Sequence, residues 1–133
     1  MDGEINLSAI LAPISIGELF DKISILEIKA TRLTDAAKLS NVRRELKALY
    51  PIAEQFTGRN VEEAKLGLRS VNLELWETED RIRVCEARGD FGPEFIALAR
   101  AVYQTNDRRA AWKRQINTYF SSAIVEEKSY ADG

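Results

Sequence analysis

Apolar residues recur at alternating steps of three and four along the stretch from residue 61 to residue 88. This series consists of Val61, Ala64, Leu68, Val71, Leu75, Thr78, Ile82 and Cys85. Residues three and four apart lie on one face of an α-helix, so the series predicts a single long helix. A stripe that keeps this rhythm over eight positions is typical of a seam between packed helices. The chain is therefore expected to fold by packing helices side by side.

Three other segments also show helical spacing, and the seven glycines and three prolines fall mostly between the segments. Ser15 and Glu18 form a capping box that predicts the start of the first helix, and Pro93 suits the first position of the last one. Pro51 is expected to kink the second helix or to end it early, because proline lacks an N–H group. The predicted helices span residues 16–33, 36–56, 61–88 and 93–120.

Short links between long helices favour antiparallel neighbours. We therefore predict an all-α fold, an antiparallel four-helix arrangement of two helical hairpins, in a single domain over residues 1–133. Residues 1–14 form a lead-in, and residues 121–133 form an extension that either frays or folds back with Tyr130 as its anchor. Asn41–Arg44 and Asn106–Arg109 both read Asn-x-Arg-Arg, which indicates either a pseudo-repeat of the two hairpins or a coincidence between charged helices.

Composition excludes several classes of function. The 133 residues carry a net charge of −2, so a basic nucleic-acid-binding domain is not expected. Histidine is absent and Cys85 is alone, which excludes an intrachain disulfide and a Cys/His zinc site. Acidic groups on the first and third helices could hold Mg²⁺, but their spacing to arginines favours a salt-bridged surface. We therefore expect no metal and no cofactor. Without a bilayer span, and with an acidic start, a cytoplasmic location is expected.

The fourth predicted helix carries a stripe that changes character. It begins with Phe95, Ala99 and Val102 and continues with polar and basic residues. Because burying an unpaired cation is unfavourable, these groups either meet carboxylates inside the bundle or line a hydrated pocket for a phosphate or carboxylate. The candidate ligand-binding residues are Arg44, Asn106, Arg109 and Lys113, and the candidate acidic partners are Glu27, Glu77 and Asp80.

Several apolar residues lie off the main stripes. An extra apolar face on a small bundle predicts self-association or a protein partner, and the candidate interface residues are Ile25, Ile28, Leu73 and Trp76. Together with the lack of a complete catalytic set, this favours a non-catalytic helical interaction domain. The alternative is an enzyme or sensor that binds a small anionic ligand through arginine, lysine and asparagine side chains on its helices.

A series of phrases between about residues 12 and 130 resembles an uncharacterised bacterial family, a domain of unknown function. The phrases are IGELFDKISILEIK (16–29), NVRREL (41–46), LWETED (75–80), LARAVY (98–103), TNDRRA (105–110) and EEKSY (126–130). The resemblance implies no catalytic residues, because no activity is established for the family. It implies a context in bacterial glycosyltransferase or surface-polysaccharide functions, and hence an accessory role in glycan or envelope biosynthesis.

Overall fold

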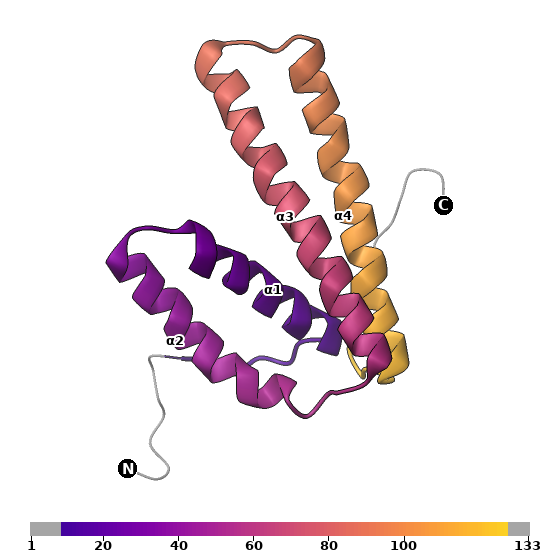
Figure 1. The fold of residues 1–133 in the computed structure, drawn as a ribbon. Coiled ribbons are helices and arrows are strands. Elements are labelled where there is room, and N and C mark those ends of the chain that lie inside the picture. The colour runs from indigo at the N-terminus through magenta and orange to yellow at the C-terminus, as the bar shows by residue number, and fades with distance from the viewer. Residues whose placement is uncertain (1–8, 128–133) are drawn as a thin grey trace.

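The structure, a computed structural model, describes residues 9–127 and confirms the all-α fold (Figure 1). Its four helices form two hairpins, as predicted, and the part of the chain that is described contains no strand. None of these helices is long and apolar enough to cross a membrane. The helices are α1 (Ile16–Arg32), α2 (Ala36–Ala53), α3 (Arg59–Arg88) and α4 (Pro93–Tyr119).

The helix ends follow local chemistry. The Oγ of Ser15 accepts the backbone N–H of Glu18 at 2.9 Å, which caps α1 as the capping box predicted. Helix α2 continues past Pro51 but ends at Ala53, three residues before the predicted end at residue 56. Helix α3 begins two residues before the predicted start and ends at Gly89, whose φ of +66° is readily adopted only by glycine.

Helix α1 is the central element of the fold. Helices α3 and α4 lie antiparallel as one long hairpin, and α1 begins against their lower half in the view of Figure 1 and then diverges from them. Helix α2 packs against α1 and against neither α3 nor α4. The upper half of the α3–α4 hairpin, which ends in the turn after Gly89, therefore extends beyond the α1–α2 hairpin without another helix against it.

Two apolar clusters hold α1 in this position. Leu19, Ile23 and Leu26 of α1 pack against Val42 and Leu46 of α2. On another side of the same helix, Phe20 packs with residues of both long helices, namely Val61, Ala64, Leu68 and Ile116. A helix that is apolar on more than one side must be covered on more than one side, which explains the central place of α1.

Two glycines allow the helices to approach closely. A Cβ added to Gly17 of α1 would overlap with the backbone carbonyl oxygen of Lys113 in α4. A Cβ added to Gly67 of α3 would overlap with the indole ring of Trp112. Trp112, which lies off the main stripes in the sequence, is thus partly buried against the second core cluster. Each glycine weakens its helix by roughly 1 kcal/mol relative to alanine, and the close contact explains its presence.

The predicted apolar stripe of α4 is partly wrong. Ala99 is exposed, whereas Leu98, Thr105 and Ile116 are buried. The buried face of α4 is therefore displaced from the predicted stripe over its first half, because α3 covers this part of α4 and α1 does not reach it. From Asn106 onwards the predicted polar stripe does lie near α1, and it forms the contacts described next.

Candidate functional site

A buried ion pair joins α1 to α4 at the centre of the molecule. The side chain of Asp21 is fully buried, and the guanidinium of Arg109 donates through Nε to Asp21 Oδ1 at 2.9 Å and through Nη2 to Oδ2. This bidentate arrangement is the strongest geometry for an arginine and a carboxylate. The hydrogen bond to Asp21 raises the pKa of Arg109, although partial burial opposes this change. Arg109 is thus committed to an internal carboxylate.

Asn72 of α3 completes the environment of this pair. Its Nδ2 donates to Asp21 Oδ1 at 3.0 Å and to the Oγ of Ser24 at 3.3 Å. Asp21 therefore receives hydrogen bonds from two long helices, and its charge is compensated on both oxygens. Among residues 9–127, no buried side-chain nitrogen or oxygen lacks a hydrogen-bond partner. The polar groups between α1 and the α3–α4 hairpin form a satisfied network.

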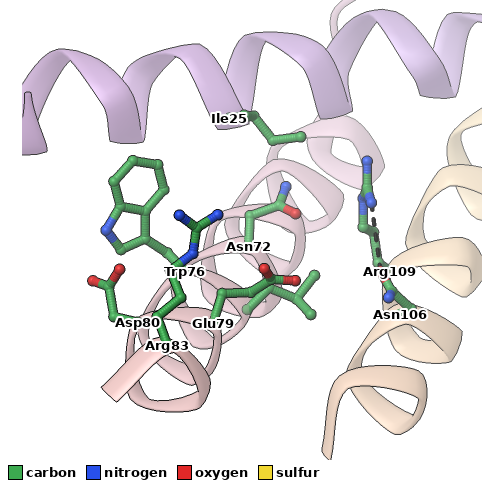
Figure 2. Close-up of a pocket in the computed structure, with 9 residues that line it drawn as sticks. Ile25, Asn72, Trp76, Glu79, Asp80, Arg83, Asn106 and Arg109 are labelled. Carbon is green, nitrogen blue, oxygen red and sulfur yellow. Dashed lines mark hydrogen bonds between the residues drawn. The ribbon is translucent and has the colours of Figure 1, made fainter. Parts of the chain in front are cut away.

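A cleft of about 480 Å³ opens beside this network, where α1 diverges from α3 (Figure 2). Ile25 of α1 forms one wall, and Asn106 and Arg109 of α4 form the opposite side. The volume lies within the usual range for small-ligand sites. Helix α3 contributes the largest share of the lining, through Asn72, Leu75, Trp76, Glu79, Asp80 and Arg83.

The charges that line the cleft are mixed. Glu79, Asp80 and Arg83 line it from α3 and Arg109 lines it from α4, so two acids balance two bases. Arg109 has only Nη1 outside its contact with Asp21, and this atom lies 3.5 Å from Oδ1 of Asn106. The cleft is therefore not the strongly basic pocket that a bare phosphate would require. It can accommodate an apolar group beside Trp76 together with polar groups of either sign.

Lys113 lies one turn beyond Arg109 and does not line this cleft. Its Nζ donates to Oε2 of Glu18 at 2.6 Å. The same Nζ lies 3.2 Å from Oε1 of Glu126, which belongs to the segment that follows α4. Burial alone would lower the pKa of Lys113. The hydrogen bonds to Glu18 and Glu126 and the charges of these two carboxylates outweigh burial, so the pKa of Lys113 is raised. Both basic residues of the predicted stripe thus face carboxylates.

The structure separates the other candidate polar residues. Arg44 is exposed on α2 and lies near Asn41, remote from Arg109. Glu27 accepts the hydroxyl of Tyr50 at 2.8 Å, and burial together with this contact raises the pKa of Tyr50 to about 12. Glu77 pairs with Arg32 at 3.3 Å on the surface. Of the three predicted acids, Asp80 alone lines the cleft.

The candidate interface residues are also divided. Ile25 and Trp76 are partly exposed and line the cleft, and Leu73 is partly buried. Ile28 is only 1% exposed, so it belongs to the core and cannot contact a partner. Asn72 is not among the candidates, and the sequence places Asp21 only in an acidic pair with Glu18 that could be salt-bridged or hold Mg²⁺. The signal for Asp21 is its place between Phe20 and Ile23 in the apolar series of this helix, where a buried carboxylate requires a partner.

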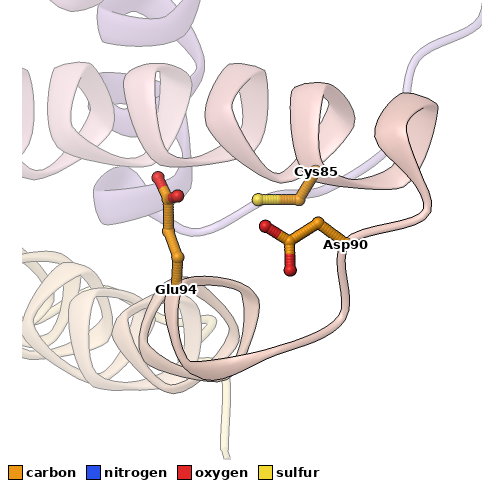
Figure 3. Close-up of side chains that lie close together, drawn as sticks. All are labelled: Cys85, Asp90 and Glu94. Carbon is orange, nitrogen blue, oxygen red and sulfur yellow. The ribbon is translucent and has the colours of Figure 1, made fainter.

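A thiol and two carboxylates lie close together at the turn between α3 and α4 (Figure 3). One ligand atom each from Cys85, Asp90 and Glu94 lie within 4.8 Å of one another, so this group could hold a metal ion. Each acid already has a contact in the turn, since Asp90 accepts the N–H of Gly92 at 3.1 Å and Glu94 pairs with Arg81 at 3.4 Å. Burial raises the pKa of the Cys85 thiol, and the charges of Glu94 and Asp90 raise it further.

Comparison with protein families identifies the chain over most of its length. A family described as "Family of unknown function (DUF6165)" matches residues 10–133. The chain belongs to this family. The match confirms the resemblance to an uncharacterised domain. No curated protein and no solved structure matches this member of the family.

Proposed function

We propose that this protein is a non-catalytic helical interaction domain. The observation that supports the proposal is the uncovered part of the α3–α4 hairpin. Ile96 and Tyr103 are 55% and 54% exposed, and with Ala99 they continue along α4 the helical stripe on which Asn106 borders the cleft. We call Trp76, Ile96, Ala99 and Tyr103 the distal face.

The composition of the distal face supports protein binding. Apolar side chains that gather on a surface and are surrounded by charges are typical of interaction sites. Tryptophan, tyrosine and arginine dominate the binding energy of many interfaces, and the distal face offers Trp76 and Tyr103 with Arg83 beside them. A helix pair with one open side gains stability when further helices cover that side.

We propose a second copy of this chain as the occupant. Two α3–α4 hairpins that meet across a two-fold axis would complete a four-helix bundle from two open pairs. The hairpin carries six acids and four bases between residues 79 and 107. This near balance lets two identical surfaces approach without strong repulsion and place opposite charges across the axis.

The experiment compares the mass of the protein in solution with that of charged variants. Tyr103→Glu and Trp76→Glu place a carboxylate on the distal face and should convert a dimer to a monomer while preserving the helical circular dichroism signal. Leu66→Glu is the matched control, because Leu66 is 72% exposed on α3 outside the distal face. A monomeric wild-type protein at high concentration would refute self-association. A Tyr103→Glu variant that stays dimeric would refute the distal face as the interface.

The sequence resemblance supports a wider setting in bacterial glycan or envelope biosynthesis, which we include in the proposal. We propose the cytoplasm as the compartment, since a single free thiol such as Cys85 remains reduced there. The net charge of −2 gives no support to nucleic acid as a partner. Pull-down from a bacterial lysate, with Tyr103→Glu as the negative control, tests whether envelope-biosynthesis proteins bind the distal face.

The second candidate function is the sensing of a small anionic ligand, and the cleft beside Asn106 and Arg83 is the observation that favours it. A thermal-shift screen with sugar phosphates, nucleotides and dicarboxylates tests this function. A ligand at 100 times its dissociation constant stabilises the folded state by about 2.7 kcal/mol. Arg83→Ala and Asn106→Ala are the appropriate variants, because Arg109→Ala would leave Asp21 unpaired. A shift that both variants retain would place the ligand elsewhere.

A further inference from the structure

The segment that follows α4 returns to the start of α1 and places one carboxylate among three donors. Glu126 Oε1 accepts the hydroxyl of Ser15 at 2.6 Å and lies 3.2 Å from Lys113 Nζ. Its Oε2 accepts Nδ2 of Asn117 at 3.0 Å. The donors come from the N-cap of α1 and from the last two turns of α4, so the carboxylate connects two helices that are distant in sequence.

These donors are built into the fold. Ser15 is 1% exposed and Asn117 is 2% exposed, whereas the Glu126 side chain is 38% exposed. Gly17 carries no Cβ at the point where α1 meets the Lys113 carbonyl, which lets the two helices bring Ser15 and Asn117 together. The site therefore consists of a buried N-cap residue and two residues of α4, one buried and one partly buried, and its occupant is a more exposed residue of a non-helical segment.

The orientation of each donor is determined by a second contact. The Oγ of Ser15 accepts the N–H of Glu18, so its hydrogen is directed outward to Glu126. Oδ1 of Asn117 accepts the N–H of Gly17 at 2.6 Å, so its amino group is the part that faces Glu126. Lys113 adds a positive charge. Lys113 also donates to Glu18, but the three oriented donors all point at the position of the Glu126 carboxylate and define a site that selects an oxyanion.

The electrostatics of Glu126 agree with this selection. Burial alone would raise the pKa of the Glu126 carboxyl, but the hydrogen bond from Ser15 and the charge of Lys113 outweigh burial and lower its pKa to about 2. The anionic form is thus strongly preferred in this position. Next to it, Glu127 lies 3.6 Å from Arg114 across the protein surface, with both side chains more than half exposed.

We propose that Ser15, Lys113 and Asn117 form a binding site for an external carboxylate or phosphate oxyanion, and that Glu126 is an intramolecular occupant that such an anion displaces. The site lies apart from the distal face and from the cleft beside Arg83. Displacement would release residues 123–127, since the Oγ of Ser122 still accepts the N–H of Ile16 at 3.2 Å, so ligand binding and movement of these residues would be linked.

A tethered carboxylate competes at an effective concentration of roughly millimolar order for a short connection. Removing it should therefore expose the site. The Glu126→Ala variant is titrated with sodium phosphate and, separately, with sodium acetate, against sodium chloride at equal ionic strength, and its melting temperature is followed. We expect each effective anion to bind this variant at least about ten-fold more tightly than the wild-type chain. Glu127→Ala is the matched control and should respond as the wild type does.

The two anions distinguish sources of the ligand. A response to phosphate alone indicates a phosphate monoester, and a response to acetate alone indicates a carboxylate such as a peptide C-terminus. Adding Lys113→Met to Glu126→Ala should abolish either response. If Glu126→Ala is too unstable to titrate, Glu126→Gln removes the charge and keeps the size. No stabilisation of the Glu126 variants by either anion, or equal stabilisation of the Glu127→Ala variant, would overturn the proposal.

Discussion

Replacing Arg109 with methionine tests whether the central ion pair is structural. The Asp21 side chain is 0% exposed, so the variant leaves a carboxylate in the interior with Asn72 as its remaining donor. Breaking a buried pair by removing one partner costs about 3–5 kcal/mol. Because the Arg109 side chain is 29% exposed and its position can admit water, we expect the lower end, about 3 kcal/mol. For a chain of this length that loss lowers the melting temperature by roughly 10 °C.

The assay is urea unfolding followed by circular dichroism, and a neighbouring arginine supplies the control. Nη2 of Arg108 lies 2.7 Å from Oε2 of Glu74, but both side chains are about half exposed. Arg108→Met should therefore lower the free energy of unfolding by under about 1 kcal/mol. Adding Asp21→Asn to Arg109→Met should recover part of the loss, because the double variant leaves no buried charge. Similar small losses for Arg109→Met and Arg108→Met would refute the assignment of Asp21 as a buried charge that requires Arg109.

Three further outcomes follow from the close contacts and the C-terminal segment. Gly17→Ala should lower the free energy of unfolding by about 1–3 kcal/mol, because the methyl group meets the Lys113 backbone carbonyl and the helices must separate; urea unfolding measures this. Gly67→Ala should cost at least as much, because the methyl group meets the fused-ring atoms of Trp112 and must displace an indole that is packed against the second core cluster; a neutral or stabilising effect in the same assay would contradict this explanation. The folded-state pKa of Glu126 is lowered, so its contribution to stability is present above about pH 4.3 and is lost as pH falls towards about 2; the stability difference between wild type and Glu126→Gln should vanish over that range in acid-dependent thermal unfolding.

The helices could be predicted from the sequence because their signals are local. The three-and-four spacing from Val61 to Cys85, the capping box at Ser15 and the glycine at position 89 each act within a few residues. Their energetics do not depend on what lies across the core. The end of α2 was less predictable, since the effect of Pro51 depends on how many residues the helix can continue before its missing hydrogen bond matters.

The arrangement of the hairpins depended on information that periodicity does not contain. The predicted stripe on α4 combined residues that face α1, such as Arg109, with Ala99, which no helix covers. Both positions satisfy the same spacing rule. The difference arises because α1 is 17 residues long and α4 is 27, so α1 cannot cover all of α4. Helix length therefore determined which part of a regular stripe became a core and which part remained exposed.

The repeated Asn-x-Arg-Arg phrase shows how position determines the role of a residue. Nη1 of Arg44 donates to Oδ1 of Asn41 at 3.4 Å, and Nη1 of Arg109 donates to Oδ1 of Asn106 at 3.5 Å. The two phrases therefore form the same local contact. Helix α2 meets α1 through apolar residues, and Arg44 remains in solvent. Helix α4 meets the side of α1 that carries Asp21, and Arg109 is drawn into the interior. A fully buried carboxylate with one bidentate partner tolerates little rotation of one helix about the other. We therefore infer that Asp21, which no motif identified, determines how the two hairpins are oriented, and that this orientation leaves the distal face open.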